Sequence, residues 1–221
     1  MTRTNLALAA VLMVATLAAV SIAVAGSIPG DMQLPIHWGL NGEADGFAGK
    51  WTALLMPPLI VAGLSLLFYF LPALEPRKEG LERSQGLYLW GWIGLLLIGA
   101  AIELAVVSAA LGWDLPVNRV ITGAVGAMLV LIGNQLGKSR SMYLIGVRTP
   151  WTLASEEVWI RTHRLAGKLM VGTGAAIAVA SLLPLPPALL MQAMLAAVVA
   201  TAAVPVVYSY LLWRRERQAR G

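Results

Sequence analysis

The sequence lacks cysteine altogether and contains little charge. None of its 221 residues is cysteine, so disulfide bonds, thiolate metal sites and cysteine nucleophiles are excluded. Charged side chains make up 12% of the chain, whereas a soluble domain usually has about 25%. This shortage of charge indicates a polytopic membrane protein rather than a soluble enzyme.

Long apolar runs are abundant, and 58% of the residues are hydrophobic. A helix needs about 20 mostly apolar residues to cross the hydrocarbon core of a bilayer. Six stretches qualify: 6–25, 52–74, 87–111, 120–136, 166–184 and 188–212. The predicted fold is therefore all-α, a polytopic transmembrane bundle of six spans in which the first span is not cleaved as a signal peptide.

Basic residues are distributed unevenly between the segments that connect these spans. Of the 16 Lys and Arg residues, only Lys50 and Arg119 belong to one side of the predicted membrane. Cytoplasmic connections carry the excess of basic residues, which predicts a multi-pass membrane protein with both termini in the cytoplasm. The net charge of +5 is explained by this orientation, so the lipid bilayer and not nucleic acid is the expected partner.

The outer loop, residues 27–50, contains the polar stretch LPIHWGLNGEADGFAGK. Asn41-Gly42 and Asp45-Gly46 are turn signals, because glycine accepts positive φ and Asn or Asp bonds its own backbone. Conspicuous polar loops often bind ligands. The residues predicted to face a ligand are His37, Trp38, Asn41, Glu43, Asp45 and Lys50. No metal is expected, because the spacing of His37, Glu43 and Asp45 fits neither an EF-hand nor a zinc signature.

Glu103 and Asn134 are conspicuous among the polar residues of the predicted spans. Glu103 lies deep in the third span, where a carboxyl group is costly unless it is protonated, paired or hydrated. Its position is compatible with a proton-linked or ligand-contacting site, and equally with a protonated acid bonded to a neighbouring helix. Asn134 lies within Gly133–Gly137, where the two glycines at the ends favour close helix contact.

The segment GVRTPWTLASEEVWIRTHRLAGK, from Gly146 to Lys168, concentrates polar and aromatic residues between the fourth and fifth spans. A helix is predicted from about Leu153 directly into the fifth span, with Glu157 and Arg161 close enough to pair. We expect a cap at the membrane interface, anchored by its tryptophans. No GxSxG turn is present and no carboxylate is spaced to orient His163, so neither enzymatic activity nor a cofactor is expected.

This segment resembles the signature of the SdpI family, bacterial multipass membrane proteins named for immunity to a toxin. The residues that carry the resemblance are Asn134, Arg148, Thr149, Pro150, Trp151, Thr152, Glu157, Trp159, Thr162, His163 and Arg164. The outer loop, with Pro35–Trp38 and Lys50-Trp51, resembles the DUF1648 domain that often precedes it. One departure is Met142, because the family often has Asn before the aromatic residue found here as Tyr143.

The resemblance implies a non-enzymatic protein that protects its cell from a secreted antimicrobial peptide or protein toxin and signals to a cytoplasmic repressor. It also implies a division into a DUF1648-like two-span unit (1–75, with outer loop 27–50), a cytoplasmic linker (76–86) and an SdpI-like four-span unit (87–221, with motif loop 137–168). The alternatives are a small proton-linked transporter that uses Glu103 and, less favoured, a membrane-embedded enzyme. The sequence does not name the toxin, the partner or the oligomeric state.

Overall fold

The computed structural model describes residues 2–219, which contain eight α-helices and one two-stranded sheet. In chain order the elements are α1 (Arg3–Ser27), β1 (Gln33–Trp38), β2 (Ala44–Gly49), α2 (Lys50–Leu74), α3 (Lys78–Arg83), α4 (Gln85–Ala110), α5 (Val117–Leu136), α6 (Pro150–Ala154), α7 (Glu156–Leu182) and α8 (Pro187–Gln218). Six of these helices are long and apolar enough to cross a membrane: α1, α2, α4, α5, α7 and α8. The six predicted spans are therefore confirmed.

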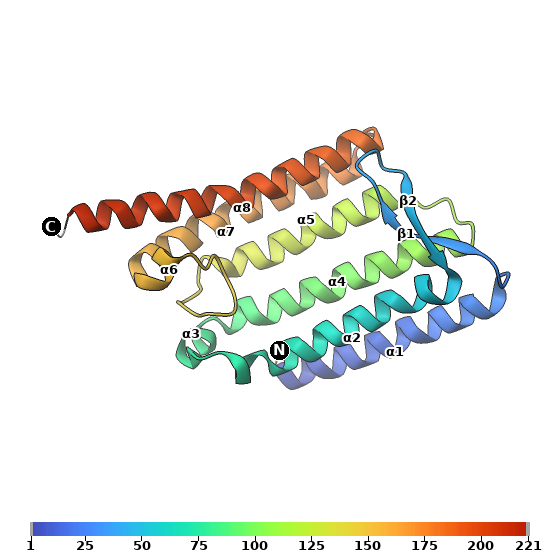
Figure 1. Ribbon diagram of the computed structural model, residues 1–221, viewed down its shortest axis with the longest axis horizontal. Helices are drawn as coiled ribbons and strands as arrows, with labels where there is room; N and C mark the ends of the chain where they lie inside the picture. The colour runs from blue at the N-terminus through green and yellow to red at the C-terminus, as the bar shows by residue number, and fades with distance from the viewer. Residues whose placement is uncertain (1, 220–221) are drawn as a thin grey trace.

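The long helices lie roughly side by side in a row (Figure 1). Helices α1 and α2 pack against each other and against α4, α4 packs against α5, α5 against α7, and α7 against α8. Among the described residues, α1 and α2 make no more than marginal contact with α5, α7 or α8. Helices α3 and α6 lie at one end of the row and the β1–β2 hairpin at the other (Figure 1). We refer to these as the inner end and the outer end, after the orientation that the basic residues predict.

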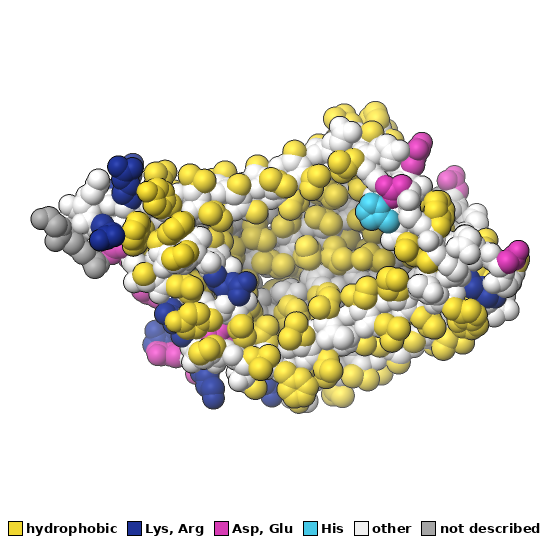
Figure 2. Space-filling view, viewed as in Figure 1, with side chains coloured by type: hydrophobic (Ala, Val, Ile, Leu, Met, Phe, Trp, Pro, Cys, Tyr) yellow, Lys and Arg dark blue, Asp and Glu magenta, His cyan; other side chains and the backbone are white. Residues whose placement is uncertain are grey.

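The surface of the bundle is apolar along most of its length. Hydrophobic side chains cover the middle of the face in Figure 2, whereas charged side chains gather mainly toward its two ends. Large apolar side chains such as Leu12, Leu59 and Val207 are exposed, which suits contact with lipid rather than water. The chain is a multi-pass membrane protein.

The expectation of an all-α fold is wrong in the outer loop, because residues 33–49 form a β-hairpin. Its strands are antiparallel, with Gln33 opposite Gly49 and Trp38 opposite Ala44. Strand β2 reads Ala-Asp-Gly-Phe-Ala-Gly, without the β-branched residues that usually predict a strand. Asp45-Gly46, predicted as a turn, lies within β2 instead.

Proline residues in α2 leave backbone carbonyls without their helical donors, and side chains of neighbouring helices donate hydrogen bonds to these carbonyls. Pro58 has no N–H, so the carbonyl of Leu54, four residues earlier, loses its usual helical donor. The hydroxyl of Ser21 in α1 donates to that carbonyl at 2.7 Å. A buried carbonyl is costly without a donor, so this bond fixes α1 against α2.

The same arrangement occurs near the inner end of α2. Pro72 leaves the carbonyl of Phe68 without its helical donor, and the hydroxyl of Tyr88 in α4 donates to it at 2.8 Å. Trp92, also in α4, donates from Nε1 to the hydroxyl of Ser65 at 3.1 Å. These two bonds attach α4 to α2.

Helices α5 and α7 approach each other closely through glycines. A Cβ at Gly126 of α5 would lie 2.7 Å from the carbonyl oxygen of Gly174, and one at Gly133 would lie 2.9 Å from that of Gly167. Side chains larger than hydrogen would therefore separate the helices. The close contact predicted at Gly133 is confirmed.

Candidate functional site

The turn of the outer hairpin is held by its own backbone and by Asn41. The N–H of Gly39 donates to the carbonyl of Glu43 at 2.9 Å. The amide side chain of Asn41 accepts from the N–H of Glu43 at 3.1 Å and donates to the Glu43 carboxylate at 3.0 Å. Gly42 has a φ of 83°, which favours glycine. The turn signal at Asn41-Gly42 is confirmed.

His37 and Asp45 form a polar pair on the exposed side of the hairpin. His37 Nδ1 lies 2.5 Å from Asp45 Oδ1, and the two side chains are 70% and 53% exposed. Glu43 is bonded to Asn41 instead. Within residues 2–219, no three His, Asp or Glu side chains are grouped so as to hold a metal ion, so the structure does not assemble His37, Glu43 and Asp45 into a site.

The hairpin is attached to the helices at both its base and its tip. At the base, Lys50 Nζ donates to the carbonyls of Ala25 and Ile28, at 2.7 and 2.9 Å, where α1 ends. At the tip, Asn118 Nδ2 of α5 donates to the carbonyl of Gly42 at 2.8 Å. Lys50, predicted to face a ligand, therefore uses its amino group to brace the chain.

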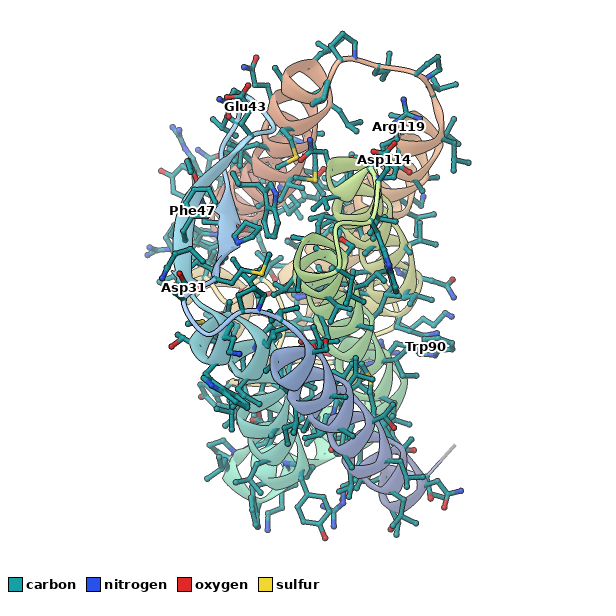
Figure 3. The ribbon with its side chains drawn as sticks, turned by 90° about the vertical axis from the view of Figure 1, so that its right-hand side faces the viewer. Asp31, Glu43, Phe47, Trp90, Asp114 and Arg119 are labelled. Atoms are coloured by element: carbon teal, nitrogen blue, oxygen red, sulfur yellow. The ribbon has the colours of Figure 1, made fainter. Side chains whose placement is uncertain are left out.

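The hairpin crosses the outer end of the helix row from α1 and α2 toward α5. Figure 3 looks onto this end and shows Glu43 and Phe47 on the hairpin, with Asp114 and Arg119 beside the start of α5 on the other side.

One face of the hairpin covers a buried apolar cluster. This outer cluster comprises Val24, Ala25, Leu34, Ala53, Leu54, Val106, Val107 and Ala110, with Ile28, Met32, Trp38 and Ala48 packed against it. Trp38 thus faces the bundle.

At the inner end, the short helix α6 is held by reciprocal threonine bonds. Thr149 Oγ1 accepts from the backbone N–H of Thr152, and Thr152 Oγ1 accepts from that of Thr149. Together with Pro150 as the first helical residue, this is a capping box. The Thr152 hydroxyl also lies 2.8 Å from the carbonyl of Val147.

Helix α6 does not continue into α7, contrary to the expectation of one helix from Leu153. Ser155 is extended, with φ −139° and ψ 120°, and separates the two helices. Its hydroxyl accepts from the N–H of Val158 and so caps α7. Glu157 and Arg161 approach to 3.8 Å, but both are exposed, so their ion pair contributes little stability.

Trp151 joins α6 to α8. Its Nε1 donates to the hydroxyl of Ser209, and its ring packs against Tyr210 and Trp213, with centroids 5.4 and 6.3 Å away. Trp151 is half-buried, which suits the predicted anchoring role.

Trp159 and His163 lie in the protein interior, so the prediction of an interfacial anchor is wrong for Trp159. Both side chains are 0% exposed, and their rings stack at a centroid distance of 3.9 Å. His163 Nε2 accepts from the N–H of Val147 at 2.9 Å, and Nδ1 lies 2.8 Å from the carbonyl of Trp159. An accepting nitrogen carries no proton, so these bonds define a neutral imidazole protonated on Nδ1.

Gly146 allows the loop to approach the imidazole of His163. Its φ is 114°, and a Cβ at this position would lie 2.5 Å from His163 Nε2. Only glycine combines this backbone conformation with the space required. The Gly146-Val147 pair in the motif is therefore explained by contact with His163.

Glu75 organises the inner loop, and the sequence did not point to it. Its carboxylate is 1% exposed and accepts from the N–H groups of Arg77, Tyr143 and Leu144, at 2.9, 3.0 and 2.8 Å. The Arg77 guanidinium hydrogen-bonds to the side chain of Ser141 and lies 4.4 Å from the centre of the Tyr143 ring. The sequence did contain one signal for Glu75: it is an acidic residue at the end of an apolar span, next to proline and arginine.

The other polar residues predicted to be functional are either not bonded to the inner loop that Glu75 holds or are attached to it by a single hydrogen bond. Arg148 is exposed and donates from Nη1 to the carbonyl of Tyr143 at 2.8 Å. Arg164 and Asn134 are exposed, whereas Thr162 is buried. The motif therefore has two parts. Residues such as Thr162 and His163 are buried, whereas the basic residues Arg148 and Arg164 are exposed.

Met142, at the position where the resembling family often has Asn, is 0% exposed and belongs to the same apolar cluster as Trp159. The departure therefore places an apolar side chain in an apolar environment. A hydrogen-bonding amide is not needed there.

By its fold, the chain is a six-span membrane protein with one braced polar segment at each end. Residues 138–209 match the SdpI/YfhL protein family, and residues 11–61 match a domain of unknown function, DUF1648. The chain is 30% identical over 149 residues to "Immunity protein SdpI" of Bacillus subtilis (strain 168), which covers 67% of this chain and 69% of that protein. No solved structure matches it. The chain belongs to the SdpI/YfhL family, as the resemblance indicated.

Proposed function

We propose that this protein is a non-enzymatic immunity protein of the bacterial cytoplasmic membrane, which protects its cell from a secreted antimicrobial peptide or protein toxin. The relative named as an immunity protein supports this role. The excess of basic residues at the inner end supports an orientation with both termini in the cytoplasm and the hairpin outside. Residues 1–75 and 87–221 would then be the two-span and four-span units.

The observation that carries the proposal is the exposed face of the outer hairpin. This face is fixed at its base and tip, so a ligand would meet a preorganised surface. It presents the His37–Asp45 pair beside polar Asn41 and Glu43 and the exposed ring of Phe47. A mixture of polar groups and an exposed aromatic ring suits a peptide or protein ligand.

Replacing His37 and Asp45 together by alanine is expected to reduce protection against the toxin by about tenfold, the effect of losing about 1.4 kcal/mol of binding. Both side chains are mostly exposed, so the membrane level of the variant should be unchanged. The measurement is survival of a toxin-sensitive strain that expresses each variant, with toxins encoded beside this gene as the test agents.

The matched control replaces Glu79 and Arg83 by alanine, because they form an exposed ion pair at the inner end. Its protection should equal that of the wild type. Unchanged protection in the His37/Asp45 variant would exclude this pair from toxin contact. A wild-type protein that protects against none of these toxins would contradict the proposed function itself.

We further propose that the inner end presents Arg148 to a cytoplasmic repressor. Arg148 is exposed but bonded to the backbone of Tyr143, whose N–H is in turn held by Glu75. Changing Arg148→Gln is expected to keep the membrane level while a reporter gene under the repressor no longer responds to toxin. The control is Lys138→Gln, an exposed charge in the same loop. A normal reporter response in Arg148→Gln would exclude this role.

A proton-linked transporter is the second candidate, and the buried carboxyl group of Glu103 favours it. The sequence lacks a pair of interrupted spans at matching positions in two halves, which is a common feature of transporters. A solute flux in proteoliposomes that is lost in Glu103→Gln would favour this candidate over immunity.

A further inference from the structure

Glu103 lies in a hydrogen-bond chain that links three membrane-spanning helices. Its side chain, from α4, is 3% exposed, and its Oε1 lies 2.6 Å from Ser21 Oγ of α1. The same Ser21 Oγ lies 2.7 Å from the carbonyl oxygen of Leu54 in α2. Three oxygens therefore lie in sequence, and protons must be assigned to the two contacts between them.

The Ser21 hydroxyl has one proton and so can donate only once. The carbonyl of Leu54 can only accept, and Pro58 deprives it of its usual backbone donor. The serine proton therefore serves Leu54. The contact between Ser21 and Glu103 then needs a proton from Glu103, because two acceptors at 2.6 Å would repel each other. The bonding pattern requires a carboxylic acid at Glu103.

Within residues 2–219, no cation forms an ion pair that would balance an ionised Glu103. Besides Glu103 itself, the charged or titratable groups of the elements packed around it are Arg3 in α1, Lys50 and Tyr69 in α2, Tyr88 in α4, Arg119 in α5 and His37 in β1. Arg119 lies in the first turn of α5 at the outer end (Figure 3) and, within the described residues, forms no ion pair with Glu103. Lys50 is bonded to backbone carbonyls, and His37 is paired with Asp45. Arg3 is 18 residues from Ser21, about 27 Å along the helix.

The two tyrosines lie toward the inner end of the helices, and both are weak acids that supply no positive charge. Within residues 2–219, Glu103 Oε2 is buried and has no hydrogen-bond partner. An ionised carboxylate left in this way would be strongly unfavourable.

We propose that Glu103 is an intramembrane proton-binding site whose proton completes the chain from Glu103 through Ser21 to Leu54 and so holds α1, α2 and α4 together. The site lies next to the support of the hairpin. Val106 and Val107, one helical turn beyond Glu103, belong to the outer cluster, as does Leu54. Breaking the chain is therefore expected to loosen the hairpin.

The first test is infrared difference spectroscopy of the full-length protein in lipid nanodiscs, wild type minus Glu103→Gln, at neutral pH. The expected result is a C=O band of a protonated carboxyl group that shifts in D2O. Carboxylate bands alone would overturn the proposal. A carboxyl band that is replaced by carboxylate bands on adding Na+ would also overturn it, because the occupant would then be a metal cation.

The second test uses the absence of native cysteine. Ala48→Cys places a single thiol on the half-buried, cluster-facing side of β2, and Phe47→Cys places the matched control on its exposed side. Adding Ser21→Ala is expected to accelerate maleimide labelling of the first thiol about tenfold, as for loss of one buried hydrogen bond, and to leave the control unchanged.

Adding Glu103→Gln should leave labelling of Ala48→Cys slow, because the amide N–H can replace the donated proton. Equal labelling rates with and without Ser21→Ala would overturn the coupling to the hairpin. Both tests are independent of toxin protection, so their failure is distinct from failure of the proposed function.

Discussion

Replacing Trp159 by alanine is expected to lower the free energy of unfolding by about 3–5 kcal/mol, the usual cost of truncating a buried aromatic side chain. Trp159 is 0% exposed, and its ring stacks on His163. Its loss leaves a cavity where the Gly146-Val147 backbone meets α7, and it removes one side of the support for the imidazole. Reversible unfolding in mixed micelles with increasing denaturant measures the change.

The matched control is Trp90→Ala in α4. The indole of Trp90 is 37% exposed and lies on the outside of the helix row (Figure 3). We expect its loss to cost less than about 1 kcal/mol. If the two substitutions have equal effects, Trp159 does not have the structural role assigned to it.

Replacing Glu75 by alanine is expected to destabilise the protein by about 3–5 kcal/mol, comparable to breaking a buried charge interaction. Three backbone N–H groups, of Arg77, Tyr143 and Leu144, lose their shared acceptor. Two of them belong to the loop between α5 and α6, so this loop should lose protection before the helices do. Amide hydrogen exchange followed by mass spectrometry over residues 139–147 measures the effect.

Two further variants separate the acceptor role of Glu75 from its charge. Glu75→Gln keeps one acceptor oxygen, so exchange in the loop should lie between those of the wild type and Glu75→Ala. Glu79→Ala removes an exposed acid from the nearby helix α3 and should leave exchange unchanged. Loop protection that survives in Glu75→Ala would show that Arg77 and the apolar contacts hold the loop without the carboxylate.

The six spans could be predicted because membrane insertion imposes a length and a composition on each helix. The hairpin could not, because β2 contains two glycines and two alanines and shows no β-branched alternation. Its stability depends on Leu34, Trp38 and Ala48 packing on a cluster that includes α4, which is distant in the sequence, as well as α1 and α2. The break at Ser155 was missed because serine, although favoured at an N-cap, is also tolerated inside a helix, so its presence alone does not end one.

The spacing of Trp159 and His163 predicts that they lie on the same face of a helix, but it does not tell whether that face is buried. Trp159 and His163 are four residues apart, and they do lie together on one helix face. That this face points inward depends on Gly146 and Val147, and the sequence offers no local signal for such a contact. Glu75 was missed because its partners Tyr143 and Leu144 are 68 and 69 residues away, and its place at the end of an apolar span does not reveal them.

The single-file order of the long helices has a mechanical consequence. Helices α1 and α2 meet the rest of the bundle mainly through α4, so α4 is the one long helix that connects the two halves. The halves are also attached at both ends: Asn118 donates to the carbonyl of Gly42 at the outer end, and Glu75 and Arg77 bond to the α5–α6 loop at the inner end. A relative movement of the two halves about α4 would therefore strain the attachments at both ends of the bundle together.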